Sequence, residues 1–290
     1  MYQYKDPCRT GGRAPGEGGG GNGRAGGAGK AVGETVYGTV AGSVVGGGVG
    51  VTVGEGQHAG GRERTQQPYT TGTSVVALKY AGGVMVAADT LLSYGSMLKA
   101  KEVTRVAAVG KDANMLLAYS GDHSDYQAVL DMVKRLSKED FQEDDGSSLT
   151  AGELHEWLSR VMYNRRNKMD PLWNTLVVAG RGDGGAPFLG VTDSIGTHYQ
   201  EDFIATGFGN YLAIPLLRNE WKADLSEAEA RRLVEKCMMV LYYRDKQSIN
   251  KITVATVDAD GARVGEPYAV STQWELDLYL NPTKNSVGNW

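Results

Sequence analysis

The sequence predicts an α+β fold, specifically a four-layer αββα sandwich of two antiparallel sheets with a pair of helices outside each. Strand-like and helix-like stretches come in separate runs, in the order strands, two helices, strands, two helices, strands. Such segregation argues against a doubly wound parallel sheet. The first strand-like runs are apolar without alternation, as expected of strands that are covered on both faces.

The first run of strands begins at residue 74. SVVALKY (74–80) and VMVAAD (84–89) flank Ala81-Gly82-Gly83, which predicts a β-hairpin with a short glycine turn. Two further β-rich runs, 103–110 and 114–121, are separated by the turn-forming pair Lys111-Asp112. These four runs supply the first strands of the sandwich.

The first helix pair follows. Apolar residues recur at steps of three and four after Asp122 or Ser124, either of which is suited to cap a helix. An acidic loop is predicted at 139–146, and then Thr150 and Glu153 have the spacing of a capping box ahead of a second apolar-periodic run, 154–162. Pro171 bounds this second helix.

The second half repeats the scheme. Runs 175–180, 187–192 and 197–200 are predicted strands, and the glycine turn 206–209 leads into a short third helix. The fourth helix opens on the capping-box pair Ser226 and Glu229. A strand at 252–258 and a turn at 258–261 close the regular part.

Glycine divides the chain into unlike parts. Of its 41 glycines, 22 fall in residues 1–64, and such a segment lacks the side chains to close a core. We expect a glycine-rich leader over 1–64, one domain over 65–272 and a C-terminal tail over 273–290. The 20 uncharged residues 35–54 are long enough to span a bilayer, but about half are Gly, Thr or Ser, so a leader is favoured over a membrane span.

Charge and composition exclude several classes of function. The formal net charge of −4 gives no electrostatic footprint for nucleic acid. Cys8 and Cys237 do not suggest a disulfide framework, which indicates a reducing compartment, and Cys237 is expected to be a buried small hydrophobe. The four histidines are scattered and no metal or phosphate motif is present, so no metal and no cofactor is expected.

The string Gly72-Thr73-Ser74, together with Ala87-Ala88-Asp89, resembles the β subunits of the 20S proteasome, which are N-terminal nucleophile (Ntn) hydrolases. In active members a propeptide is cut after the glycine. The freed threonine hydroxyl is then the nucleophile and its amine the base. The resemblance places this threonine at Thr73 and the family's aspartate at Asp89, and it implies the Ntn hydrolase fold.

The chain departs from the active pattern at several positions. The family's lysine is Arg105 here, which keeps its charge and relays no proton. The serine of the glycine turn is Phe208, which has no hydrogen-bonding group. Asp245 and Ser248 match the family, whereas the next two glycines are Ile249 and Asn250. These departures favour a vestigial site. In the structural interpretation of these positions, Arg105 forms a salt bridge with Asp89 and Phe208 packs in the core.

Longer strings, including TQQPYTTGTSV (65–75) and MYNRRNKMDPLWN (162–174), resemble a β subunit regarded as non-catalytic. In that subunit the propeptide is cut before the glycine-threonine pair, here between Arg64 and Thr65. The resemblance implies a structural subunit of the cytoplasm and nucleus, in contact with β subunits of its own and the opposite ring and with the α ring. It also implies that the C-terminal tail, 273–290, reaches into the opposite β ring. Neither nucleic acid nor a membrane is an expected partner. The candidate interface residues are Arg165, Arg166, Trp173, Trp274, Tyr279 and Trp290.

The sequence leaves three alternatives open. The chain could be an active threonine endopeptidase that processes itself at Gly72-Thr73, or a homo-oligomeric peptidase of the simpler bacterial type. A free-standing binding module ranks last.

Overall fold

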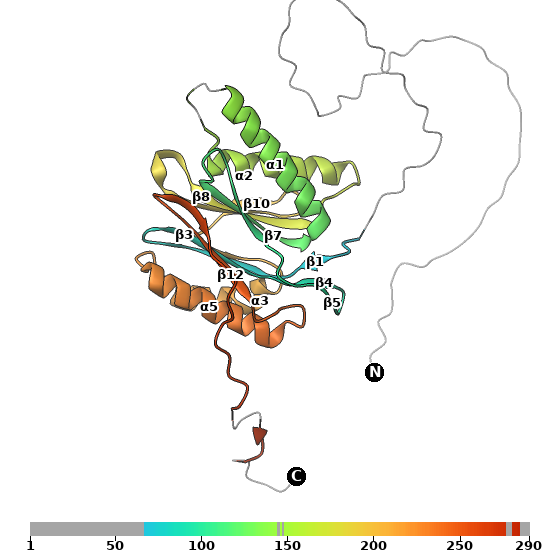
Figure 1. The fold of residues 1–290 in the computed structure, drawn as a ribbon, viewed down its shortest axis with the longest axis vertical. Helices are drawn as coiled ribbons and strands as arrows, with labels where there is room; N and C mark the ends of the chain where they lie inside the picture. Colours follow the sequence, from blue (N-terminus) through green and yellow to red (C-terminus); the bar gives the residue numbers. More distant parts are fainter. Residues whose placement is uncertain (1–66, 144–145, 147, 277–279, 285–290) are drawn as a thin grey trace, which may run out of the picture. The chain divides into compact units, whose positions relative to one another are not determined.

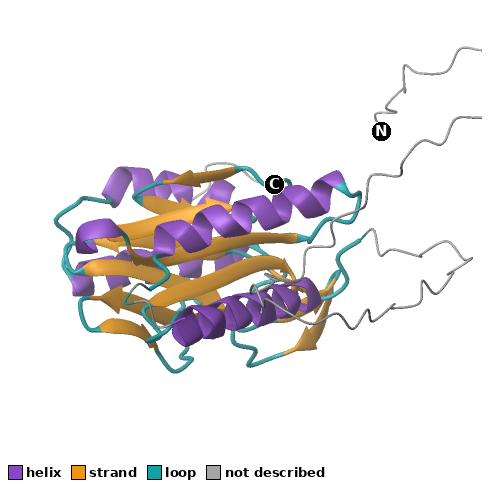
Figure 2. Ribbon diagram, turned by 90° about the horizontal axis from the view of Figure 1, so that it is seen from above, coloured by secondary structure: helices purple, strands orange, loops and turns teal. Residues whose placement is uncertain are grey.

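The computed structural model describes residues 67–143, 146, 148–276 and 280–284. Within them, two antiparallel sheets lie face to face between two layers of helices (Figures 1 and 2). This arrangement confirms the predicted αββα sandwich. The leader 1–64 lies outside the described residues.

The larger sheet has eight strands in the order β10-β9-β8-β7-β1-β4-β5, with β6 paired to β7 off this path. All of its pairs are antiparallel. Its strands are β1 (Thr71–Gly72), β4 (Leu92–Tyr94), β5 (Met97–Ala100), β6 (Val106–Val109), β7 (Met115–Asp122), β8 (Asn174–Arg181), β9 (Pro187–Thr192) and β10 (His198–Gln200).

The smaller sheet has five strands in the order β11-β2-β3-β12-β13. At its centre, β2 and β3 form the predicted hairpin, in which Tyr80 faces Gly83. Its strands are β2 (Val75–Tyr80), β3 (Gly83–Asp89), β11 (Phe203–Ala205), β12 (Ile252–Asp258) and β13 (Gly261–Val264).

Helices cover the outer face of each sheet (Figure 1). The larger sheet carries α1 (His123–Glu143) and α2 (Ala151–Asn167), and a 3-10 turn, Asp183–Gly185, joins β8 to β9. The smaller sheet carries α3 (Gly209–Leu212), α4 (Ile214–Glu220) and α5 (Glu227–Arg244). Both predicted capping boxes are present, at Thr150 for α2 and at Ser226 for α5. Asp122 caps α1, because its carboxylate accepts the backbone N–H groups of Ser124 and Asp125.

Three apolar layers hold the sandwich together. The middle layer lies between the sheets and includes Val75, Val86 and Leu189, while the outer layers lie beneath the helices. Strands β2 and β3 contribute to both of their neighbouring layers, which explains their apolar runs without alternation. Cys237 lies on the buried face of α5 as expected, and burial raises the pKa of its thiol to about 12.

Several boundaries differ from the sequence prediction. Helix α1 continues to Glu143, so the loop predicted from 139 begins later. The short third helix is two helical segments, α3 and α4, with Pro215 in the first turn of α4. The short strands β1, β4, β5, β11 and β13 were not predicted.

Within the part of the chain that the structure describes, no helix is both long and apolar enough to cross a membrane. The uncharged run 35–54 lies outside that part. Those same described residues contain no cluster of three or more His, Cys, Asp or Glu side chains suited to a metal ion.

Candidate functional site

Thr73 lies between β1 and β2, at a point where the chain is fixed on both sides. Strand β1 pairs with β4 and β7, with Thr71 opposite Asp122 and Gly72 opposite Gly121. One residue earlier, the carbonyl of Thr70 accepts the N–H of His123 at 2.8 Å. The segment that precedes Thr73 is thus built into the larger sheet, and the nitrogen of Thr73 is an amide of the chain.

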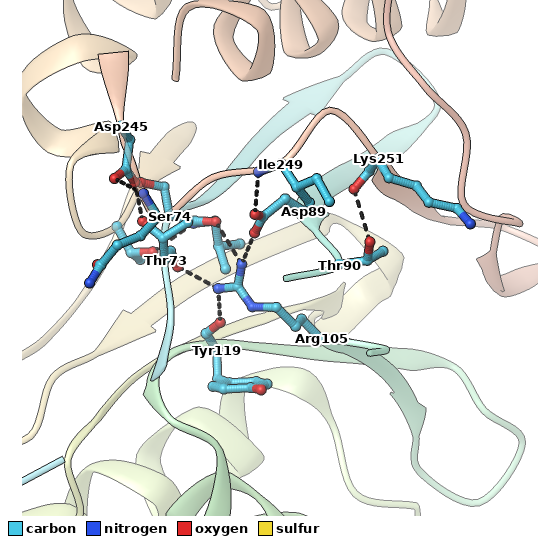
Figure 3. A network of polar contacts seen from close by, with 12 residues as sticks. Thr73, Ser74, Asp89, Thr90, Arg105, Tyr119, Asp245, Ile249 and Lys251 are labelled. Atoms are coloured by element: carbon cyan, nitrogen blue, oxygen red, sulfur yellow. Dashed lines mark hydrogen bonds and ion pairs between the residues drawn. The ribbon is translucent and has the colours of Figure 1, made fainter. Parts of the chain in front are cut away.

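Arg105 occupies the centre of the site beneath Thr73 (Figure 3). Its side chain is fully buried, and its guanidinium donates to the carbonyls of Thr73, Ser74 (3.4 Å) and Tyr119 (2.8 Å). Gly72 makes room for it, because a Cβ at residue 72 would lie 2.3 Å from the Arg105 Nε. The arginine therefore acts as a fixed clamp on the backbone around Thr73.

Asp89 neutralises this buried charge. Its Oδ1 accepts from Arg105 at 2.5 Å and its Oδ2 accepts from the backbone N–H of Ile249 at 3.1 Å. Burial raises the pKa of Asp89 to about 6, although the charge of Arg105 opposes the rise. The predicted salt bridge between the two residues is confirmed.

The hydroxyl of Thr73 donates to Asp245, at the end of α5. Asp245 in turn accepts the backbone N–H of Gln247 at 2.9 Å, and the N–H of Ser248 donates to the Asp245 carbonyl at 3.1 Å. The structure thus brings Thr73, Asp89, Arg105 and Asp245 into one network, as Figure 3 shows for the labelled residues. Ser248 joins it through its backbone.

A cleft of about 520 Å³ opens beside Thr73. Its lining includes Thr73, Trp173, Phe208 and Tyr211. Phe208 is 53% exposed, so the expectation that it packs in the core is wrong. It follows Gly207, whose φ is +57°, in the turn between β11 and α3, and its side chain borders the cleft.

Two hydroxyls that the sequence prediction did not single out hold this turn. Thr206 Oγ1 accepts the N–H of Val75 at 2.9 Å, and Ser74 Oγ accepts the N–H of Gly209 at 3.0 Å. Both side chains are buried. The only sequence signal for them is their place, one beside Thr73 and the other beside the glycine turn.

The candidate interface residues fall into separate environments. Arg165 binds its own loop through an ion pair with Asp170 (3.4 Å), while Arg166 is exposed. Trp173 lines the cleft, and its backbone N–H donates to Asp125 at 2.8 Å. Trp274 is exposed and packs edge-on against Tyr243 of α5, with ring centroids 4.9 Å apart. The remaining predicted positions, Arg64, Thr65, Tyr279 and Trp290, lie outside the described residues.

Comparison with known proteins agrees with this geometry. Residues 69–257 match the proteasome subunit family. The chain is 49% identical over 228 residues to a proteasome subunit beta type-4 of Arabidopsis thaliana, covering 79% of this chain and 92% of that one. It is 46% identical over 220 residues to the beta type-4 subunit of Xenopus laevis, covering 75% of this chain and 90% of that one.

A yeast relative is more distant. The proteasome subunit beta type-7 of Saccharomyces cerevisiae is 40% identical over 203 residues, which is 67% of this chain and 76% of that one. The family match runs from the segment ahead of Thr73 into β12. The chain therefore belongs to the proteasome subunit family and has its α+β sandwich, the fold of the Ntn hydrolases.

Proposed function

We propose that this chain is a non-catalytic, structural subunit of the β ring of the 20S core particle, and that it corresponds to the subunit for which its relatives are named, beta type-4. In this role it supports assembly of the ring and thereby protein degradation by the complex. The observation that carries the proposal is the setting of Thr73 between two strands, with an arginine in place of a lysine beneath it.

The first supporting argument concerns the base. An N-terminal threonine needs its own free amine to take the hydroxyl proton, but here β1 holds Thr71 and Gly72 between β4 and β7. Freeing the amine would remove β1 and the hydrogen bond from His123 to Thr70. A cut between Arg64 and Thr65 would leave both in place and keep Thr73 inside the chain.

The second argument concerns proton transfer. Arg105 remains charged at any physiological pH, and its guanidinium is engaged by Asp89 and by backbone carbonyls. It stabilises the backbone but neither accepts nor relays a proton. Phe208, at the border of the cleft, offers no polar group to assist a reaction.

The mature N terminus tests this proposal directly. Mass spectrometry of the chain from purified particles should find a first residue at Thr65. A chain that begins at Thr73 would contradict the non-catalytic role and would support the rival, an active threonine endopeptidase processed at Gly72-Thr73.

A matched substitution gives an independent readout. Thr73→Ala should leave the peptidase activity of the assembled particle unchanged, since no step is assigned to its hydroxyl. Ser93→Ala, which removes a buried hydroxyl on β4, controls for effects of the substitution on particle yield. Loss of one peptidase activity in Thr73→Ala alone would favour the rival.

Further parts of the proposal concern assembly and location. We expect contacts with β subunits of the same and opposite rings and with the α ring, and residence in the cytoplasm and nucleus. Native mass measurement of the particle should give a mixed assembly. Fourteen identical chains would instead favour the bacterial type of homo-oligomer. Imaging of a tagged chain in cells would test the proposed location.

A further inference from the structure

The segment after β13, residues 268–274, follows a fixed path and is here called the tail root. Its first residue, Tyr268, forms an isolated antiparallel bridge with Ile252 at the start of β12. The N–H of Ile252 donates to the carbonyl of Tyr268 at 2.8 Å, and the N–H of Tyr268 donates to the carbonyl of Ile252 at 3.0 Å. Since β13 pairs only with residues 255–258 of β12, the tail root takes up the pairing that β13 leaves open.

Asn250 continues this pairing with its side chain. Its Nδ2 donates to the carbonyl of Val270 at 2.8 Å, and its Oδ1 accepts the N–H of Val270 at 2.9 Å. A side-chain amide offers a donor and an acceptor, as a backbone peptide does. The Asn250 side chain therefore satisfies both backbone groups of Val270 and replaces one further step of a strand ladder.

The loop that carries Asn250 is held from inside the molecule. The N–H of Ile249 donates to the buried carboxylate of Asp89 at 3.1 Å. Earlier in the loop, the N–H of Gln247 donates to the buried Asp245 at 2.9 Å. The network around Thr73 thus sets the position of Asn250, and Asn250 passes that position on to the tail root.

Helix α5 holds the tail root at two further points. The hydroxyl of Tyr268 donates to Glu235 at 2.6 Å, and the hydroxyl of Tyr243 accepts the N–H of Gln273 at 2.8 Å. Together with the contact between Asn250 and Val270, these bonds are spread from residue 268 to residue 273. They therefore fix the direction of the segment as well as its position.

We propose that Asn250 is a positioning residue for the C-terminal tail. Together with Tyr243, it orders the tail root before any partner binds, so that the tail beyond it engages the opposite ring from a set place and direction. A segment that is already ordered loses less conformational entropy on binding, so this anchoring favours pairing of the two rings. The inference rests on the proposed function, since it assumes a contact with an opposite ring.

Hydrogen exchange tests the anchor itself. Half-particles that contain the full chain are labelled in deuterated buffer, and exchange is read at the amide of Val270 by mass spectrometry. Asn250→Ala should speed this exchange by roughly five- to tenfold, the factor that corresponds to the net contribution of one hydrogen bond. Asn219→Ala, at an exposed asparagine of α4, is the matched control and should leave it unchanged. An unchanged exchange rate in Asn250→Ala would overturn the inference.

Pairing of half-particles tests what the anchor is for. Asn250→Ala should lower the yield of double rings on native gels by roughly fivefold, because ordering of the tail root must now accompany the contact. The thermal midpoint of the chain should stay within about 4 °C of the unaltered value, and Asn219→Ala should pair normally. Normal pairing in Asn250→Ala, or a defect accompanied by a larger fall in the thermal midpoint, would overturn the positioning role.

Tyr243→Phe provides a second test that does not depend on Asn250. It removes the hydroxyl that accepts from Gln273 and keeps the aromatic ring, so it should give the same pairing defect with faster exchange at Gln273. Normal pairing in this variant would contradict the proposal even if Asn250→Ala failed to fold. The N-terminal mass measurement is independent of these results: a chain that begins at Thr73 would remove the non-catalytic role and leave the anchor in place.

Discussion

Arg105 determines the surroundings of Thr73 more than any other side chain. It is fully buried, it holds Asp89 at 2.5 Å, and it donates to carbonyls from three residues. A buried ion pair of this kind need not add net stability compared with an apolar pair. Removal of one partner is costly, however, because the other charge is left buried and unpaired.

Replacement of Arg105 should therefore be severe. We expect Arg105→Met to lower the free energy of unfolding by about 3–5 kcal/mol, since Asp89 is left buried without its cationic partner. Urea denaturation of the full chain measures this change. Arg166→Met, at an exposed arginine, should change the same quantity by less than about 0.5 kcal/mol. Equal effects of the two substitutions would refute the clamp role.

Gly72 permits the arginine to pass close to the backbone. Gly72→Ala would place a Cβ 2.3 Å from the Nε of a buried side chain that has no room to withdraw, so we expect a loss of about 1–3 kcal/mol in unfolding free energy. Gly152→Ala on α2 is the control, because its Cβ would meet nothing closer than 3.7 Å. That substitution should be neutral or stabilising.

His155 should make stability dependent on pH. Its Nε2 lies 3.0 Å from the carbonyl of Val191, and burial lowers its pKa below the usual 6.5, with a smaller contribution from His198. Below pH 6.5 the imidazole of His155 is therefore protonated more readily in the unfolded chain than in the folded chain. The folded state loses stability as the pH falls, by at most about 1.4 kcal/mol per pH unit.

A pair of histidine variants isolates this effect. His155→Gln should flatten the dependence of the thermal midpoint on pH between about 6.5 and 5. His198→Gln, at an exposed histidine, should keep most of it. If the thermal midpoint of His155→Gln depends on pH as that of the unaltered chain does, His155 is not the source of the pH dependence.

Phe208 marks the limit of prediction at the scale of single residues. Thr73, Asp89 and Arg105 could be placed together from the sequence because a family pattern fixes their spacing. The sequence predicts Phe208 in the core because large apolar residues usually lie there. Its exposure depends on the turn that Thr206 and Ser74 fix across the sheet, and such long-range hydroxyl contacts leave no local trace.

At the scale of elements, prediction succeeded where the signal is local. The second helix was placed by its capping box and apolar period, and the hairpin of β2 and β3 by its glycine turn. Strands β1, β4 and β5 have two to four residues, too few to show a period. Strand β1 forms because β4 and β7 offer it hydrogen-bonding partners from distant positions, which sequence spacing does not reveal. Strands β4 and β5 pair with each other across a short turn.

The capping box of α2 provides a test at this scale. Thr150 Oγ1 accepts the N–H of Glu153, and the Glu153 carboxylate accepts the N–H of Thr150 at 2.8 Å. Thr150→Ala should cost about 0.5–2 kcal/mol of unfolding free energy. Thr197→Ala, at an exposed turn position, should have a much smaller effect. If the helical circular dichroism signal of Thr150→Ala is lost at a lower temperature than that of the unaltered chain, the loss of stability lies in the capping of α2.

At the scale of the whole molecule, the sandwich was predictable because its layers follow from the order and apolarity of the elements. The role of the C-terminal tail was not, since it depends on partner subunits. In the structure the tail begins with packing onto α5: Gln273 donates its N–H to the Tyr243 hydroxyl at 2.8 Å, and Trp274 packs edge-on against Tyr243. The root of the tail therefore belongs to the folded unit.

Two truncations separate this packing from the proposed contact with the opposite ring. A chain ending at Leu276 keeps Trp274 against Tyr243, so we expect its thermal midpoint to match that of the full chain. A chain ending at Thr272 loses that contact and should unfold at a lower temperature, because the aromatic pair contributes about 0.5–1.5 kcal/mol beyond its buried area. If the tail joins the two halves of the particle, both truncations should leave half-particles unpaired on native gels. Normal yield of double rings from the chain ending at Leu276 would refute that role for residues 277–290. Half-particles from the same chain, with an unchanged thermal midpoint, would show that residues 277–290 act through the contact between the rings and not through the stability of the fold.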